Sequence, residues 1–156
     1  MGYIKYYGYE WDVGRSIKFQ PTDWELEHLE CHFMHGTFSG ATVFNHQPLV
    51  EESMFKDAGN FNQPLADWNT SNVQDMFYMF LKASSFNQPL ADWDTSRVED
   101  MSCMFGEATS FNQPLADWDT SHVRNMAGMF QEATSFDQPL ADWDTSRVGD
   151  MAHMFG

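Results

Sequence analysis

The sequence has little positive charge. Its 156 residues include eight Lys and Arg against 23 Asp and Glu, which gives a formal net charge of −15. The few basic residues are scattered along the chain, whereas binding to a phosphate backbone depends on clustered Lys and Arg. The composition therefore argues against a nucleic-acid partner. It favours cationic partners or divalent ions, or serves solubility alone.

Cysteine and long apolar runs are also scarce. The two cysteines, Cys31 and Cys103, cannot build a disulfide framework, so we expect two free thiols. No apolar run reaches the roughly 18 residues that a membrane-spanning helix needs. The N-terminal segment MGYIKYYGYEWDVGR has no uninterrupted apolar stretch of the kind found in a secretory signal. We therefore predict no membrane insertion.

Catalytic motifs are missing as well. The sequence contains no glycine-rich phosphate loop, no zinc-protease helix motif and no nucleophile in a recognisable context. Acidic residues abound but recur periodically, whereas a catalytic pair needs two carboxylates in different environments. The sequence therefore predicts a protein that is not an enzyme and that needs no cofactor.

One phrase fills much of the chain. FNQPLADWDTS occurs unchanged at 86–96 and 111–121, and with one substitution at 61–71 and 136–146. A fixed period of 25 residues predicts a solenoid in which each copy stacks on the next. A degenerate copy begins at TFSGATVFNHQPL. We therefore divide the chain into a capping region at 1–36, a degenerate repeat at 37–60, and repeats at 61–85, 86–110, 111–135 and 136–156, the last incomplete.

Each repeat contains two patterns. Val73, Met76, Phe80 and Ala83 are spaced by three, four and three residues, which indicates one face of a short helix. The run 65–70 follows a proline and is typical of a short strand. We expect Phe, Leu, Trp, Val and Met to form interior columns. The predicted fold class is an α/β-type repeat solenoid, with one short parallel strand and one short helix per repeat.

The spacing L-x-x-W-x-T-x-x-V-x-x-M-x-x-M-F-x-x-A-x-x-F resembles the BspA-like leucine-rich repeats of bacterial surface proteins. The resemblance covers 37–156. It implies a leucine-rich-repeat solenoid without catalytic residues, located at a cell surface or outside the cell. It also implies a role in adhesion and protein–protein contact.

If the leucine-rich pattern holds, two acidic columns face outward on a concave sheet. Two interpretations are open. Stacked carboxylates repel one another, and a row of Ca²⁺ ions or a repetitive basic partner compensates them; alternatively, the second column caps a turn and the first is simply solvated. These candidate binding residues are Asp67, Asp92, Asp117 and Asp142 in the first column, and Asp94, Asp119 and Asp144 in the second, where Asn69 takes the first place.

The repeats differ at a few positions only. Change concentrates at residues 72, 74, 77, 78, 81 and 82 and at their equivalents one period on. All of these lie off the apolar stripe of the predicted helix, on what would be the convex side. They are an alternative contact surface.

The segment before the repeats is read as a cap. Thr22 and Glu25 form a capping box and Gly36 is a fitting stop, so we predict a helix at about 22–35. The tyrosine-rich segment from Tyr3 to Trp11 is expected to add an edge strand. One helix face carries side chains with metal-ligand spacing, although one straight helix rarely supplies more than two or three ligands. These metal candidates are His28, Cys31, His32 and His35, and the alternative, which we favour, is a solvated or packed polar face without a metal.

Two functions from different classes follow. The first is a binding module that contacts a protein or polysaccharide surface through the acidic columns or the varied positions. The second is a structural protein that stacks head to tail on other copies of itself. Met154 and Phe155 would form the assembly end, because an exposed apolar surface is an association site.

Overall fold

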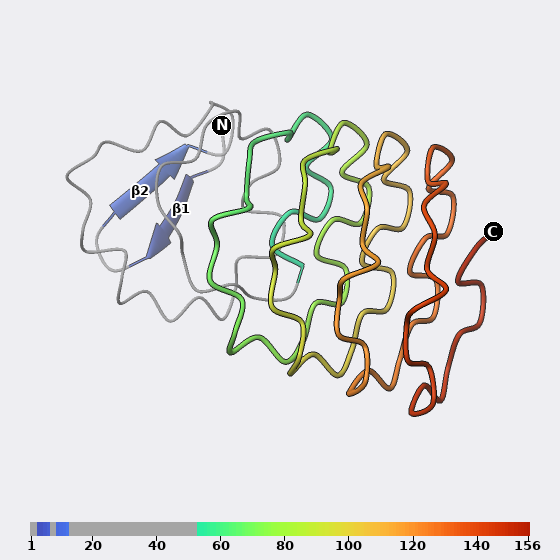
Figure 1. Ribbon diagram of the computed structural model, residues 1–156. Helices are drawn as coiled ribbons and strands as arrows, with labels where there is room; N and C mark the ends of the chain where they lie inside the picture. Colours follow the sequence, from blue (N-terminus) through green and yellow to red (C-terminus); the bar gives the residue numbers. More distant parts are fainter. Residues whose placement is uncertain (1–2, 7–8, 13–52) are drawn as a thin grey trace.

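The computed structural model describes residues 3–6, 9–12 and 53–156. Strand β1 (Tyr3–Tyr6) pairs with strand β2 (Tyr9–Asp12) in a two-stranded antiparallel sheet (Figure 1). These strands pair with each other, whereas the sequence predicted one edge strand on the repeat array. The predicted helix at 22–35 and residues 37–52 of the degenerate repeat lie outside the described residues.

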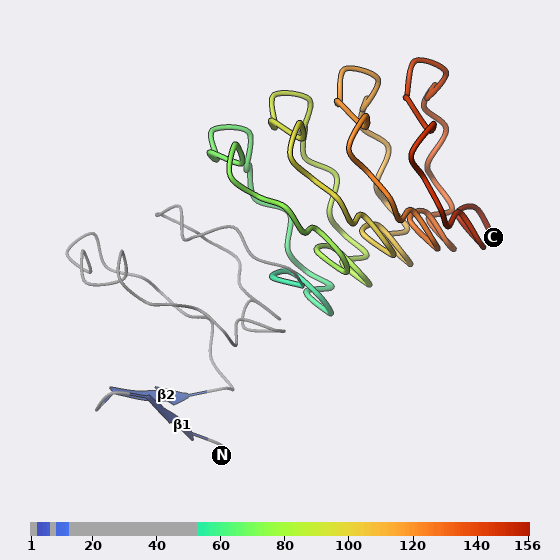
Figure 2. The same ribbon diagram turned by 90° about the horizontal axis from the view of Figure 1, so that it is seen from below.

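The four repeats lie side by side along one axis (Figures 1 and 2). Backbone hydrogen bonds join each repeat to the next: the N–H of Met76 donates to the carbonyl of Asp100 at 2.9 Å, and Met101 bonds Asn125 in the same way. Parallel bridges connect one position of every repeat. They run from Asp75 to Asp100, from Asp100 to Asn125 and from Asn125 to Asp150.

The segment with helical spacing is a series of tight turns. Its N–H groups alternate between two kinds of acceptor, a carbonyl three residues earlier and a carbonyl of the following repeat. The left-handed φ angles of Tyr78 (58°) and Lys82 (63°) fall at the third residue of the turns at 76–79 and 80–83, as a type II turn requires. The first kind of donor is Met79, Leu81 and Ala83; the second is Met76, Tyr78, Phe80 and Lys82.

The prediction of one helix per repeat is therefore wrong: the described residues contain no helix. A helix needs negative φ throughout and a bond from each N–H to the fourth preceding carbonyl, and neither condition holds here. The spacing of apolar residues cannot distinguish a helix from this series of turns, because a turn closed by a hydrogen bond to the third preceding carbonyl also brings side chains to one side. The inward orientation is confirmed, because Met76, Phe80 and Ala83 are fully buried.

The predicted strand at 65–70 is also wrong. The N–H of Trp68 donates to the carbonyl of Leu65 at 3.1 Å, and that of Val73 donates to Thr70 at 2.9 Å, so this run folds into two further turns. Apart from β1 and β2, the described residues contain no strand, only isolated bridges. The repeats consequently form no concave sheet, and the expectation of an α/β-type leucine-rich-repeat solenoid is overturned.

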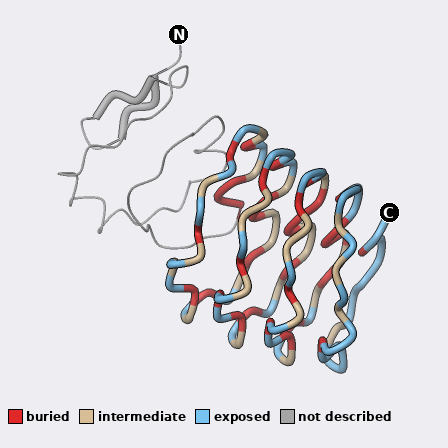
Figure 3. The backbone as a smooth tube through the Cα atoms, turned by 45° about the horizontal axis from the view of Figure 1, so that its top comes forward, coloured by how far each residue is buried: buried red, intermediate tan, exposed pale blue. Residues whose placement is uncertain are grey.

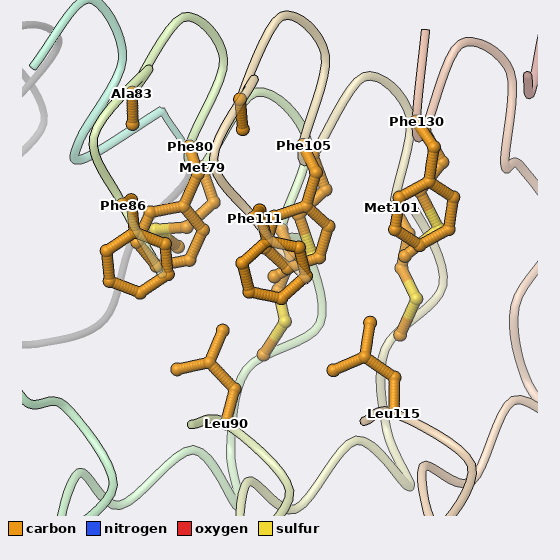
Figure 4. Close-up of a cluster of buried hydrophobic side chains, with 14 of the residues drawn as sticks. Met79, Phe80, Ala83, Phe86, Leu90, Met101, Phe105, Phe111, Leu115 and Phe130 are labelled. Carbon is orange, nitrogen blue, oxygen red and sulfur yellow. The ribbon is translucent and has the colours of Figure 1, made fainter. Parts of the chain in front are cut away.

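The core is a pair of stacked phenylalanine columns (Figure 4). Phe86 stacks on Phe111 with ring centroids 5.9 Å apart, and Phe80 stacks on Phe105 at 5.5 Å. The two columns touch where one repeat passes into the next, since Phe105 and Phe111 lie 4.0 Å apart. Leucine and methionine side chains fill the space beside the rings. Repetition of one phrase thus builds a continuous apolar interior.

Candidate functional site

The second acidic column belongs to tight local turns. Asp94 accepts a hydrogen bond from the backbone N–H of Ser96 at 3.0 Å and another from its hydroxyl at 2.7 Å. The equivalent carboxylates of Asp119 and Asp144 accept the N–H of Ser121 and of Ser146. These serine hydrogen bonds stabilise the charged form and hold the pKa of Asp94, Asp119 and Asp144 below the usual aspartate value.

All four aspartates of the first acidic column are exposed. Asp67 is the third residue of the turn that the Leu65 carbonyl closes, and its equivalents occupy the same corner of each repeat. Within the part of the chain that the structure describes, none of these four carboxylates takes part in a hydrogen bond or an ion pair. Their side chains are therefore free to meet a partner. The column is Asp67, Asp92, Asp117 and Asp142.

The varied positions pair with one another across neighbouring repeats. Glu99 forms an ion pair with Arg124 at 3.1 Å, and Lys82 forms one with Glu107 at 3.6 Å. The guanidinium of Arg97 donates to the side chain of Asn72 at 3.2 Å. These side chains meet between consecutive repeats, whereas the sequence had predicted them on the convex face of a helix, and the described residues contain no helix.

A polar interior ladder was missed at the sequence level. The indole N–H of Trp118 donates to the carbonyl of Leu90 at 2.9 Å, and the hydroxyl of Thr95 donates to the carbonyl of Asp119 at 3.0 Å. The side-chain oxygen of Asn87 accepts both the N–H of Asn112 and the amide of Gln113. The signal was available, because Asn, Gln, Trp and Thr recur with the same period as Phe. These residues explain most of the repeated phrase without reference to a ligand.

The last repeat presents a partly apolar face. Phe155 is 61% exposed and Met151 is 44% exposed, while Met154 is buried at 6%. Figure 3 shows the repeat next to the C-terminus exposed over most of its length. Of the two residues that the sequence assigned to an assembly end, the structure thus exposes Phe155 and buries Met154. Met151 was missed because it shares the interior pattern of Met76.

Cys103 is a half-buried free thiol that donates a weak hydrogen bond to the carbonyl of Ala127 at 3.6 Å. Burial, with a smaller contribution from the charge of Asp100, raises its pKa, which disfavours the reactive thiolate. The described residues contain no group of three or more potential metal ligands. The candidates His28, Cys31, His32 and His35 lie outside those residues. The part of the chain that the structure describes offers no helix that could span a bilayer.

A comparison with known protein families places the chain in one of them. A family described as "Mycoplasma protein of unknown function, DUF285" matches the chain at residues 20–94 and 50–156. Together these two ranges cover most of the sequence, and they overlap as expected for a repeated pattern. No curated protein and no solved structure matches the chain.

Proposed function

The chain belongs to the DUF285 family of mycoplasma proteins, and we propose that its repeats form a non-catalytic scaffold that binds a protein or polysaccharide at a cell surface. The finer resemblance to BspA-like surface repeats supports this role, because that family is used for adhesion. The binding element is the acidic column formed by Asp67, Asp92, Asp117 and Asp142.

The observation that carries this proposal is the difference between the two acidic columns. Carboxylates such as Asp94 are engaged by serine within their own turns. Those of the first column are exposed as well, yet they stabilise no turn in the described structure. A uniform row of charges at the spacing of the repeats suits a partner that also repeats and carries positive charge.

The experiment measures binding of the full chain to two repeating cationic probes, poly-L-lysine and chitosan, at low and moderate salt. Replacing all four aspartates of the column by asparagine should weaken binding about tenfold, which corresponds to about 1.4 kcal/mol. The matched control neutralises four acids elsewhere: Asp57, Glu107, Glu132 and Asp137. A similar loss of affinity in both variants would show that net charge alone drives binding, and it would reject the column as the binding site.

Calcium binding between neighbouring carboxylates of the same column is a subsidiary proposal, in which no more than two of these side chains contact one ion. Carboxylate oxygens are the ligands that Ca²⁺ prefers, and mutual repulsion along the column would fall on binding. Thermal melts of the full chain with and without Ca²⁺ test this directly. We expect a higher melting temperature with Ca²⁺ that Mg²⁺ does not reproduce, and an unchanged temperature rejects the cation row.

The exposed end face supports a second candidate, self-association. Phe155 stacks on Phe130 at 5.6 Å on one side, and its other side is open within the described structure. In the inner repeats the same surface is covered by the next repeat. A second copy of the chain that supplies a repeat of this kind would therefore match the face.

Light scattering over a concentration series tests self-association. The average mass should rise with concentration, and the rise should disappear in the variant Phe155→Asp. The control Asp137→Asn changes charge in the same repeat without touching the apolar face. A constant monomer mass at every concentration would reject this candidate and leave the acidic-column proposal untouched.

A further inference from the structure

One column of varied residues alternates between long side chains and glycine. The alternating members are Leu81, Gly106, Gln131 and Gly156, whereas Lys56, one period earlier, precedes Leu81 and lies outside the alternation. A Cβ atom at Gly106 would lie 2.8 Å from Cδ1 of Leu81, closer than real Cβ contacts, and one at Gly156 would lie 3.3 Å from Cγ of Gln131. Each long side chain thus occupies the space beside the glycine of the following repeat.

A second column shows the same fit. A Cβ atom at Gly128 would lie 2.8 Å from the Sγ atom of Cys103. Gly128 has a φ of 63°, but the equivalent residues Tyr78, Cys103 and His153 adopt similar angles without being glycine. The backbone conformation therefore does not require glycine at 128. The Sγ atom of Cys103 occupies the space that a side chain at position 128 would need.

Charged side chains at the varied positions also pair between neighbouring repeats in the described structure. Both ion pairs, Glu99 with Arg124 and Lys82 with Glu107, join consecutive repeats. Exposed ion pairs of this kind contribute little to stability. They add to the steric fit, which acts in the columns of residues 81 and 78. The invariant columns cannot distinguish one repeat from another, since every repeat offers the same Phe, Trp and Thr.

We propose that the varied residues specify which repeat stacks on which. Near-identical repeats permit wrong pairings, and a unique register needs features that disfavour them. If repeat 86–110 were skipped, Leu81 would face Gln131, whose Cβ atom takes the place that Gly106 leaves open. If repeat 111–135 were skipped, Cys103 would face His153 in the place of Gly128. Variation among the repeats thus reflects fit within the chain and not contact with a partner.

The first experiment forces a skipped pairing. Deleting residues 86–110 joins Ser85 to Phe111 and restores the native Ser-Ser-Phe junction. In this shortened chain, Gln131→Gly should raise the melting temperature by about 3 °C or more, because it removes the clash with Leu81. In the full chain the same substitution should lower the melting temperature by roughly 1–3 °C, since glycine only adds backbone freedom there. An equal shift in both backgrounds would overturn the proposal.

The second experiment works in the full chain and decides the matter if the shortened chain does not fold. Gly106→Ala should lower the melting temperature while Leu81 is present. In a Leu81→Ala background it should raise the melting temperature, because alanine restricts the unfolded chain and no longer meets Leu81. If Gly106→Ala shifts the melting temperature in the same direction in both backgrounds, Leu81 does not favour glycine at position 106. The proposal that the varied residues specify the order of stacking is then wrong.

Discussion

At the scale of single residues, the threonine of the repeated phrase illustrates how sequence becomes structure. Thr120 is buried, and its hydroxyl donates to the carbonyl of Asp144 in the next repeat at 3.1 Å. Thr145 occupies the same place in the last repeat but is exposed, and its hydroxyl has no partner among the described residues. The same residue type therefore contributes differently to the stability of the fold at the two positions.

This difference yields a prediction. Thr120→Val should lower the free energy of unfolding by about 1 kcal/mol, because it removes a hydrogen bond and leaves a carbonyl with fewer donors. Thr145→Val should change it by less than about 0.5 kcal/mol, as is usual for exposed sites. Urea denaturation of both variants measures the two values. Equal losses would show that the inter-repeat hydrogen bond is not what stabilises Thr120.

The acidic turns predict a response to pH. The folded pKa of Asp94, Asp119 and Asp144 lies below the unfolded value of about 3.9, so these residues stabilise the fold above that pH. Their contribution disappears as the pH falls through the folded pKa. Asparagine retains the acceptor, as Asn69 does for Ser71 at 3.1 Å, but cannot be protonated in this range.

The triple variant Asp94→Asn, Asp119→Asn, Asp144→Asn should therefore lose less stability than the parent chain between about pH 5 and pH 2. The measurement is the urea midpoint across this range. The control Asp92→Asn, Asp117→Asn, Asp142→Asn removes as many charges without touching a serine hydrogen bond. The urea midpoint of this control should fall with pH as it does in the parent chain. Identical behaviour of the two triple variants would contradict the assigned role of the serines.

At the scale of elements, each repeat uses left-handed residues that are not glycine. Glu132 has a φ of 56°, and its side chain is exposed. A non-glycine residue in this region costs roughly 1–2 kcal/mol. Glu132→Gly should consequently stabilise the protein by up to about 1 kcal/mol after the greater unfolded freedom of glycine is subtracted.

The matched control is Ser135→Gly, three residues away, where φ is not positive. There glycine relieves no strain, and we expect a loss of about 0.5–1 kcal/mol. Thermal and urea unfolding of the two variants should thus give opposite signs. Destabilisation by Glu132→Gly would show that the left-handed turn is held without cost.

The elements also mark the limit of prediction from sequence. The period, the buried set and the exposure of the acidic columns follow from which letters recur and which are apolar. The identity of the elements does not, because Met76, Phe80 and Ala83 fall on one side of a helix and on one side of a turn series alike. The helix and the turn series differ in the acceptor of every second N–H group, which in the turn series is a carbonyl of the next repeat. Local propensity carries no information about that acceptor.

The candidate site shows a similar division. The sequence left open whether the aspartates of the second column cap a turn, and the structure shows that they do so by accepting hydrogen bonds from serine. The sequence also named Met154 at the end face, where Met151 is exposed instead. Both residues belong to the repeating methionine pattern. Which of the two methionines is exposed at the end face depends on the path of the backbone and not on composition.

At the scale of the whole molecule, each repeat interacts mainly with its two neighbours. The hydrogen bonds, ring stacks and ion pairs between repeats join consecutive copies in the described part of the chain. Stability in such an array is approximately a sum of repeat terms and neighbour terms. An inner residue therefore contributes to two interfaces, and a residue in the last repeat contributes to one.

Phe105 and Phe155 offer a direct test, since they occupy one column two repeats apart. Phe105 is fully buried and stacks on both Phe80 and Phe130, whereas Phe155 is 61% exposed and stacks on Phe130 alone. Phe105→Ala should lower the free energy of unfolding by about 3–5 kcal/mol, the usual cost of emptying a core site. Phe155→Ala should cost about 1 kcal/mol or less, because most of its surface already meets solvent. Urea unfolding at low protein concentration makes the comparison. A large loss for Phe155→Ala that grows with protein concentration would instead reveal a face buried between copies.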